Sequence, residues 1–251
     1  MKTFKGWSYD GTKLEDLGFF IENYNLDLTP SLVAGDLESD TISGTIRQES
    51  VYGARKFELK GILLYEYSGD LPMQAIGTRK ISAQRALSEL FRPLVDLPLV
   101  YGFNPGRALY CQRIGDIQRK DFINHAEISI QMLARDPFFY EPWQECTVGD
   151  GDTIELTGNF STGPKIWISG DSIGNRTADP YLSINGVRAE NATAIGPGDT
   201  LHIDSANRIC AYNGTQAKNF NEEYPLLAPG TNIVYTNLDS VTIRYRPCWL
   251  T

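Results

Sequence analysis

The stretch "QMLARDPFFYEPWQECT", residues 131–147, decides how this chain is organised. It begins inside an alternating apolar pattern and then places four aromatic residues and two prolines where a surface connection would be expected. Each proline fixes its own φ and restricts the residue before it, so the segment is stiff. We predict a packed junction where the last strand of a first domain passes into a second domain. Its residues are Pro137, Phe138, Phe139, Tyr140, Pro142 and Trp143.

Length and charge set the next limits. A chain of 251 residues, 41% of them hydrophobic, fits two domains better than one, because domains most often have about 100 to 150 residues. We place the first domain at residues 1–143 and the second at 144–251. The formal net charge of −8 argues against general affinity for DNA, which comes from Lys and Arg neutralising phosphates. We expect neither that binding nor a sequence-specific nucleic-acid partner.

The chain carries no targeting signal that we can identify. No apolar run approaches the roughly 18 to 20 residues that span a bilayer, and the first residues lack the apolar core of a signal peptide. We therefore expect folding in a cytoplasm and no membrane insertion. The cysteines at 111, 146, 210 and 248 are far apart, which fits neither a zinc knuckle nor a disulfide scaffold. We predict free thiols that are buried or half-buried.

The first domain reads as a sheet with one helix. Residues 56–67 and 125–135 alternate or run apolar for the length of a strand. Between them, residues 81–96 repeat apolar side chains at spacings of three and four, with Ser82 placed to cap the start of a helix. Pro93 disfavours helical geometry in the residue before it, so the helix should end near Phe91 or Arg92.

The second domain reads as a β-sandwich or jelly roll. Strand-like segments of five to seven residues alternate with Gly, Asn, Asp and Pro turns, without a helical period. Seven strands are predicted, in "TIELTG", "KIWISG", "YLSING", "TLHIDS", "RICAYNG", "TNIVYTN" and "VTIRYRPCWL". The whole chain is therefore expected to be mainly β with one helix.

Residues 27–56 form a long, polar, Gly-punctuated segment. This length is excessive for a simple loop inside a compact domain, so two interpretations stay open. The segment is either a flexible surface loop or an extended hairpin arm that reaches a neighbouring subunit. Its apolar residues, the candidate contacts of such an arm, are Leu32, Val33, Leu37, Ile42, Ile46 and Val51.

We find no constellation for catalysis, for a cofactor or for a metal. His125 and His202 stand in different strand patterns, without ligand partners at metal-binding spacing. No G-x-S-x-G, P-loop or G-x-G-x-x-G motif occurs, so we expect a protein that is not an enzyme and has no cofactor. Aromatic residues of the second domain could stack on sugars, but their place in alternating strands favours core packing for most. They are Trp167, Tyr181, Tyr212, Tyr235 and Trp249.

Four short motifs follow one another towards the end of the chain. They are Ile203-Asp204 in a strand, the hairpin Asn213-Gly214, the turn "PLLAPGTN" at residues 225–232, and a closing strand with Tyr245-Arg246-Pro247 and Trp249. In this order they resemble the end of the distal tail proteins of bacteriophages with long, non-contractile tails. The junction "ARDPFFYEP", residues 134–142, is similar to the D-P-F-x-Y stretch that closes the first domain of that family. Over residues 1–130 the resemblance is one of organisation.

The resemblance implies a structural protein of a phage tail tip or baseplate, assembled in the host cytoplasm. In that family the first domain forms a hexameric ring around the tail channel, and an extended arm from each copy embraces the next. The second domain is a galectin-like sandwich. The implied partners are further copies of the chain, the tail tube protein, a tail-tip or tail-associated protein and a receptor-binding protein.

A second function from a different class stays open. Some relatives carry inserted carbohydrate-binding modules, for which 251 residues leave no room. The sandwich itself would then serve a carbohydrate-binding adhesion protein that recognises host cell-wall sugars. Mass in solution separates the two, because a hub forms rings whereas a lectin is able to act as a monomer.

Overall fold

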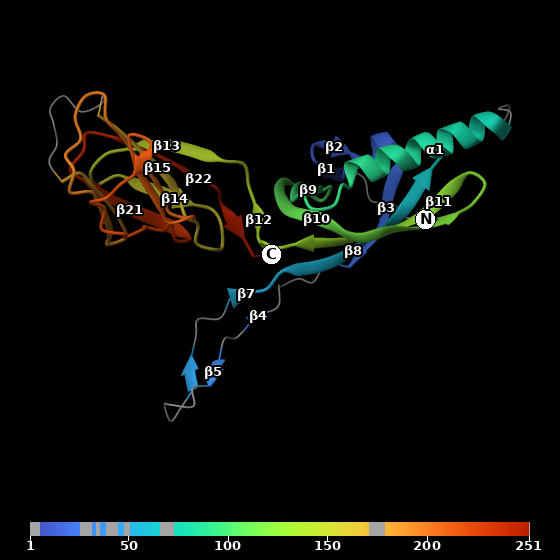
Figure 1. Cartoon of the computed structure of the whole chain (residues 1–251), viewed down its shortest axis with the longest axis horizontal. Coiled ribbons are helices and arrows are strands. Elements are labelled where there is room, and N and C mark those ends of the chain that lie inside the picture. Colours follow the sequence, from blue (N-terminus) through green and yellow to red (C-terminus); the bar gives the residue numbers. More distant parts are fainter. Residues whose placement is uncertain are drawn as a thin grey trace. The chain divides into compact units, whose positions relative to one another are not determined.

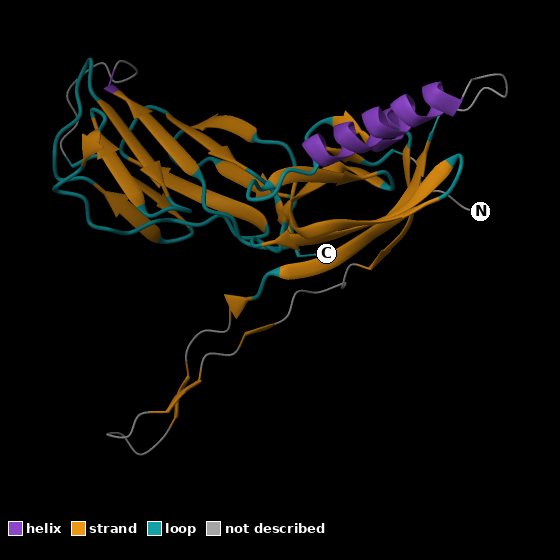
Figure 2. Cartoon of the chain, turned by 45° about the vertical axis from the view of Figure 1, so that its right-hand side comes forward, coloured by secondary structure: helices purple, strands orange, loops and turns teal. Residues whose placement is uncertain are grey.

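The computed structural model describes residues 6–25, 32–33, 36–38, 45–47, 51–65, 73–170 and 179–250. Its internal contacts divide the chain into two units. The first unit comprises residues 1–139 together with 250–251, and the second comprises residues 140–249. The chain therefore leaves the first unit once, builds the second, and returns. Figure 1 shows the two units along the chain, and Figure 2 shows how strongly strands dominate both.

The first unit is a sheet with one α-helix and a short 3-10 helix among its described residues. Its elements are β1 (Ser8–Tyr9), β2 (Thr12–Lys13), η1 (Leu14–Leu17), β3 (Phe19–Asn25), β4 (Leu32–Val33), β5 (Asp36–Glu38), β6 (Thr45–Arg47), β7 (Val51–Tyr52), β8 (Arg55–Leu64), α1 (Met73–Leu90), β9 (Leu97–Tyr101), β10 (Asn104–Asp121) and β11 (His125–Ala134); β12 (Phe139–Tyr140) begins in this unit. The main sheet has the strand order β2-β1-β9-β10-β11-β8-β3, and neighbouring strands in this order are antiparallel.

Strand β10 joins two parts of this sheet and was not predicted from the sequence. Its first half pairs with β9 and its second half with β11, with a register shift between Ile114 and Gln118. Gly115 lies in this bulge with a φ of +67°, a conformation that costs glycine little. The bulge interrupts the alternation of side chains, so the period-2 signal of a strand is lost in the sequence.

Helix α1 begins earlier than the sequence predicted. It spans Met73–Leu90, so Ser82 lies inside the helix and does not cap it. The apolar repeat predicted the later part of α1, where Leu87 is buried and Ala83 and Leu90 are half-buried. The predicted end is confirmed, because Leu90 is the last helical residue and Phe91 N–H donates to the Leu87 carbonyl at 3.0 Å.

Aromatic side chains fill the core of the first unit beneath α1. Phe91 stacks on Tyr9 with ring centroids 4.6 Å apart and meets Phe19 edge-on at 6.5 Å. The Tyr9 hydroxyl donates to the Cys111 carbonyl at 2.9 Å, so its polar atom has a partner inside the core. This satisfies the rule that buried polar groups must be hydrogen-bonded, and it allows tyrosine to serve as a core residue.

The second unit is a sandwich of two antiparallel sheets. Its elements are β13 (Gln144–Val148), β14 (Thr153–Leu156), β15 (Lys165–Ser169), β16 (Tyr181–Ile184), β17 (Val187–Glu190), β18 (Thr200–Asp204), β19 (Ile209–Tyr212), β20 (Thr215–Gln216), β21 (Gly230–Thr236), β22 (Val241–Tyr245) and β23 (Cys248–Trp249). One sheet has the order β13-β22-β15-β18-β19-β20, and the other has the order β14-β21-β16-β17. All seven predicted strands are present, and the predicted fold class, mainly β with one helix, is confirmed.

Alternation along these strands explains why the sheets stack. In β15, Ile166 and Ile168 are buried whereas Trp167 between them is exposed, and β22 follows the same rule. Apolar side chains from both sheets therefore meet in one core, as in other sandwiches. The hairpin between β19 and β20 turns at Asn213 and Gly214, whose φ angles of 48° and 76° suit a tight two-residue turn.

Candidate functional site

The segment predicted as an arm contains two short antiparallel ladders. β4 pairs with β7, which places Val33 opposite Val51, and β5 pairs with β6, which places Leu37 opposite Ile46. Leu32 belongs to β4, and Ile42 lies outside the described residues. In the described part of this segment each ladder is a sheet of two strands. Whether the segment embraces a neighbouring subunit stays a prediction.

In the first unit, the junction residues surround one buried arginine. Arg55 is 3% exposed, and its Nε donates to the Pro137 carbonyl at 2.7 Å. Its guanidinium also lies 5.4 Å from the ring centroid of Phe139 and donates to the Leu250 carbonyl. Two segments far apart in sequence, where the chain leaves this unit and where it returns, are thus held by one side chain.

The other aromatic residues of this part also have partners in the first unit. The Phe138 ring meets the Tyr52 ring edge-on, with centroids 5.8 Å apart. Phe139 lies 5.5 Å from Tyr101, a buried residue that also contacts Trp7 at 4.5 Å. The part of this segment that belongs to the first unit is therefore packed.

In the second unit, the junction residues meet the motif that ends the chain. The Arg246 guanidinium lies 4.7 Å from the ring centroid of Tyr140, and its Nε donates to the Glu141 carbonyl at 3.3 Å. Trp249 Nε1–H donates to the Glu141 carboxylate at 2.8 Å. The two stretches that carry the sequence resemblance, at 134–142 and 245–249, thus contact each other within one unit.

Trp143 differs from the expectation of a dry junction. Its side chain is 40% exposed and Pro142 is exposed beside it. Three cations surround the indole, with Arg244 at 5.0 Å, Arg246 at 5.3 Å and Lys165 at 5.8 Å from the ring. Attraction between these cations and the negative face of the indole explains how so large a side chain remains at the surface.

The "PLLAPGTN" motif closes on a buried amide. The side chain of Asn232 is fully buried, and its Nδ2 lies 2.9 Å from the Ala228 carbonyl, 2.9 Å from the Gly230 carbonyl and 3.2 Å from the Ile154 carbonyl. Its Oδ1 accepts from Ala228 N–H at 2.8 Å. One asparagine therefore satisfies the backbone of the turn and links it to β14, which explains its place in the motif.

The Ile203-Asp204 motif likewise has a structural explanation. Asp204 is 5% exposed and accepts hydrogen bonds from Asn207, from N–H at 3.1 Å and from Nδ2 at 3.0 Å. Lys165 forms an ion pair with it at 3.3 Å. Burial opposes the charged carboxylate, but these partners outweigh it and hold the pKa of Asp204 below its ordinary value.

Of the five aromatic residues for which we favoured core packing in the sandwich, two are exposed and three are half-buried. Trp167 is 37% exposed and Tyr235 is 50% exposed, while Tyr181 and Trp249 are half-buried. Tyr212 alone among the five packs against the core. For Trp167 and Tyr235 the reason is register: both occupy outward-facing positions of their strands, and alternation by itself does not identify the inward face.

A pocket in the described part of the second unit was not anticipated from the sequence. It has a volume of about 690 Å³ and lies between β19, β20 and the segment 217–224. Two aromatic rings, those of Phe220 and Tyr224, line it with centroids 5.2 Å apart, and Arg208 and Lys218 line it with charge. These residues are separated by irregular chain, so no periodic pattern marked them in the sequence.

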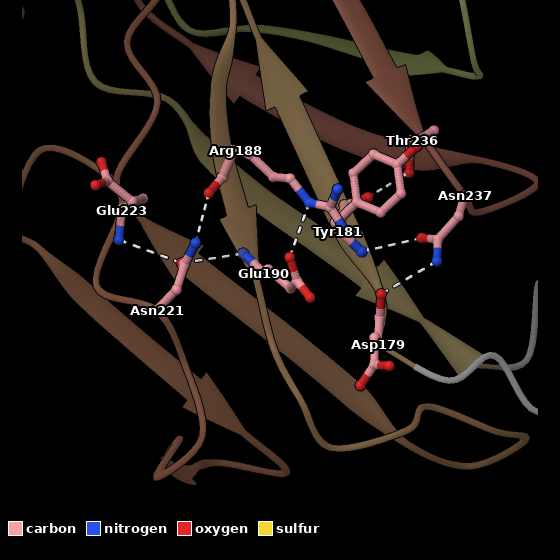
Figure 3. A network of polar contacts seen from close by, with 8 residues as sticks. All are labelled: Asp179, Tyr181, Arg188, Glu190, Asn221, Glu223, Thr236 and Asn237. Carbon is pink, nitrogen blue, oxygen red and sulfur yellow. Dashed lines mark hydrogen bonds and ion pairs between the residues drawn. The ribbon is translucent and has the colours of Figure 1, made fainter.

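A network of polar contacts anchors one wall of this pocket (Figure 3). The side chain of Asn221 accepts from Glu190 N–H at 3.1 Å and donates to the Arg188 carbonyl at 2.6 Å. The Asn221 side chain thereby hydrogen-bonds to the backbone of β17 as a neighbouring strand would. β17 is an edge strand of its sheet, so this contact covers its outer edge. The same network places the Arg188 guanidinium 3.9 Å from the Tyr181 ring.

Neither a metal centre nor a membrane span emerges from the described residues. No group of three or more His, Cys, Asp or Glu side chains there is arranged to hold a metal ion. No helix in the part of the chain that the structure covers is long and apolar enough to cross a membrane. His125 and His202 both lie in strands, and the four cysteines are free thiols, three buried and one half-buried.

No protein-family model matches this sequence, and no curated protein matches it by sequence. Among solved structures, that of SPP1 Dit, described as a paradigm of the hub adsorption apparatus in phages that infect Gram-positive bacteria, matches with a TM-score of 0.74. The match covers 99% of this chain and 100% of that chain at 16% identity. A chain of the phage P2 baseplate, in its activated conformation with Ca, matches over 98% of both chains at a TM-score of 0.44 and 8% identity. The first match alone is close enough to establish a shared fold, and it confirms the predicted resemblance at that level.

Proposed function

We propose that this protein is a structural subunit of a phage tail tip, where it forms a hexameric hub that connects the tail tube to the host-adsorption apparatus. One observation carries the proposal: the chain shares the fold of the SPP1 Dit hub protein over 99% of its length, across both units. A match confined to the sandwich would favour a lectin equally well. The match to the whole chain favours an assembly component.

The arm supplies a physical route to the ring. A closed ring needs two different complementary surfaces on each subunit. An isolated two-stranded hairpin is marginally stable in water, and the described ladders β4–β7 and β5–β6 are both of this kind. Pairing with a neighbouring copy would satisfy more backbone groups and bury Leu37 and Ile46. Ordering of the arm and assembly of the ring then become one event.

The proposed partners follow from this position in the virion. The ring contacts further copies of itself, the tail tube protein, a tail-tip or tail-associated protein and a receptor-binding protein. Its role is structural and not enzymatic. Assembly takes place in the host cytoplasm, and the mature protein belongs to the virion tail tip.

The ring is tested by sedimentation and negative-stain electron microscopy of the full chain. The expected result is a species of six subunits with a central channel. A protein that remains monomeric at the highest soluble concentration, and forms no ring after mild chemical cross-linking, overturns the proposal.

A deletion separates the arm from the rest of the assembly. Residues 33–48 are replaced by a short Gly-Ser linker, and circular dichroism checks that the subunit still folds. We expect folded subunits that no longer form rings. As a control, Gly-Ser replacement of only Asp40 and its two neighbours, inside the segment between β5 and β6, should leave the ring intact. An unchanged hexamer in the long deletion excludes the arm as the connecting element.

A further inference from the structure

We propose that the pocket between β19, β20 and the segment 217–224 binds an anionic saccharide, a sugar that carries a carboxylate or phosphate group. The pocket belongs entirely to the second unit, and its volume of about 690 Å³ lies within the range typical of small-molecule sites. The proposal stands independently of the ring. It rests on three properties of the wall: a stacking surface, unpaired cations and a fixed shape.

The stacking surface is the aromatic pair. Phe220 and Tyr224 are half-buried, and their ring planes are inclined by 58°. Their inner sides pack against the hydrophobic core of the sandwich, and both residues also line the pocket. Aromatic rings of this kind present flat apolar surface to the CH groups of a sugar ring at little cost in side-chain entropy.

The cations of the pocket differ from the others in this unit. Lys165 is paired with Asp204 at 3.3 Å and Arg188 with Glu190 at 2.8 Å, and the two remaining described arginines, Arg244 and Arg246, lie over Trp143. Arg208 and Lys218 line the pocket and form no ion pair with any residue that the structure describes. Charged donors without an acid partner are suited to a carboxylate or phosphate.

Other polar groups suit the hydroxyls of a sugar. Gln216 offers both a donor and acceptors, and Glu222 offers acceptors, on the same wall. Tyr224 adds a hydroxyl; burial, Cys210 and Glu222 raise its pKa above the ordinary value, and Arg208 acts against them. A mixture of donors and acceptors around an aromatic surface is expected of a saccharide site. A site for a simple anion needs only donors.

The wall is held in place before any ligand arrives. Asn221 N–H donates to the Glu190 carbonyl at 3.0 Å, in addition to the two side-chain bonds from Asn221 to β17. Ala192 N–H donates to the Asn219 carbonyl at 3.0 Å, and Asn219 Nδ2 donates to the Thr193 hydroxyl at 3.0 Å. A wall that is already ordered lowers the entropic cost of binding, and this raises the affinity for weakly binding ligands such as sugars.

The geometry favours a compact ring over an extended acidic peptide. A peptide gains most of its affinity by adding a strand to a free sheet edge. Here the edge beside the pocket is β20, which is two residues long. The other nearby edge, on β17, is already occupied by Asn221. Neither edge offers an extended peptide a continuous ladder.

Saturation-transfer NMR and calorimetry on the full chain test the proposal. The probes are glucuronate, glucose 6-phosphate, glucose and inorganic phosphate. The first two distinguish a carboxylate ligand from a phosphate ligand. The last two separate the contribution of the sugar ring from that of the charge. We expect binding of at least one anionic sugar, weaker binding of glucose, and weakening as ionic strength rises. The proposal is overturned if neither anionic sugar binds, or if inorganic phosphate binds as tightly as the anionic sugars. It is also overturned if a glutamate-rich peptide binds and the sugars do not.

Variants locate the binding in this pocket. The double variant Arg208→Gln, Lys218→Gln should weaken binding by about tenfold, because two charge-assisted contacts are lost. Tyr224→Leu keeps apolar volume and should weaken it through loss of the flat ring. The control is Arg85→Gln, which removes one exposed cation from α1 in the first unit. Circular dichroism verifies folding of each variant; a folded double variant with unchanged affinity excludes this pocket.

Discussion

Arg55 Nε donates to the carbonyl oxygen of Pro137 at 2.7 Å, inside the first unit. Arg55 opens β8, and Pro137 follows the end of β11, the strand with which β8 is paired. The guanidinium also donates to the Leu250 carbonyl. A buried arginine here serves backbone acceptors that would otherwise be left in a place with little water.

Replacing Arg55 should therefore destabilise the first unit. In Arg55→Met the carbonyls of Pro137 and Leu250 lose their charged donor, and each unsatisfied buried acceptor costs about 1 to 3 kcal/mol. We expect a loss of roughly 2 to 4 kcal/mol in the free energy of unfolding. Hydrogen exchange read by mass spectrometry assigns the loss to the first unit. The matched control is Arg135→Met, whose exposed ion pair with Asp96 at 3.5 Å should contribute less than about 1 kcal/mol.

Gly61 is required where β8 runs beside β3. A Cβ at this position would lie 2.3 Å from the Phe20 carbonyl oxygen and 2.9 Å from the Phe19 ring. Gly61→Ala should force the two strands apart and cost about 1 to 3 kcal/mol, as overpacking does. Gly106→Ala is the control, because a Cβ there meets nothing within 4 Å. Thermal unfolding of both variants checks the difference. Equal melting temperatures would contradict the prediction and show that β3 shifts to accommodate the methyl group without loss of stability.

His202 makes the second unit sensitive to acid. Burial lowers the pKa of His202 below its ordinary 6.5; Lys165 acts in the same direction and Asp204 acts against it. The unfolded chain therefore takes up a proton near pH 6.5 that the folded chain resists, so stability falls as the pH drops below that value. His202→Gln removes this contribution and should flatten the profile between about pH 7.5 and about 5.5. Urea unfolding measures both profiles, and parallel slopes would contradict the prediction.

Asn232 should tolerate no acid in its place. Asn232→Asp keeps the shape but replaces the donor to three carbonyls by a carboxylate oxygen. We expect the free energy of unfolding to fall by about 3 kcal/mol or more at neutral pH, because a buried carboxylate would then face the lone pairs of the carbonyl oxygens. Protonation should recover part of the loss, so the variant should be less impaired in mild acid. Asn219→Asp serves as the control and should cost less, because Asn219 is exposed and loses only its hydrogen bond to the Thr193 hydroxyl.

The cysteines should react slowly in the folded chain. Burial raises the pKa of Cys210 to about 12 and also raises the pKa of Cys111 and Cys146, so little thiolate is present at neutral pH. Cys146 is the half-buried member and should be modified first. Mass spectrometry after timed alkylation gives the order, with urea-unfolded protein as the reference. Rapid labelling of Cys111 would indicate local opening of the first unit.

Local chemistry explains which elements could be predicted from the sequence. Strands of the second unit end in turns with their own signals, such as Asn213-Gly214, where both residues take positive φ. The first turns of α1 escaped prediction because the apolar repeat recognised in the sequence starts near residue 81, whereas the helix starts at Met73. β10 escaped because the bulge at Gly115 shifts its alternation.

The pocket escaped for a different reason. Arg208 and Tyr224 stand on opposite sides of a hairpin, and only tertiary structure brings them to one wall. Trp167 was wrongly assigned to the core because alternation identifies the two faces of a strand but not which of them is exposed to solvent. For the arm residues, from Leu32 to Val51, the proposed contact with a neighbouring chain stays a prediction.

The return of the chain to the first unit imposes an order on its synthesis. The ribosome completes residues 140–249 before it adds Leu250, whose carbonyl meets Arg55. The sheet of the first unit is thus translated early, but one of its contacts, the hydrogen bond from Arg55 to the Leu250 carbonyl, forms only after the whole sandwich has been translated.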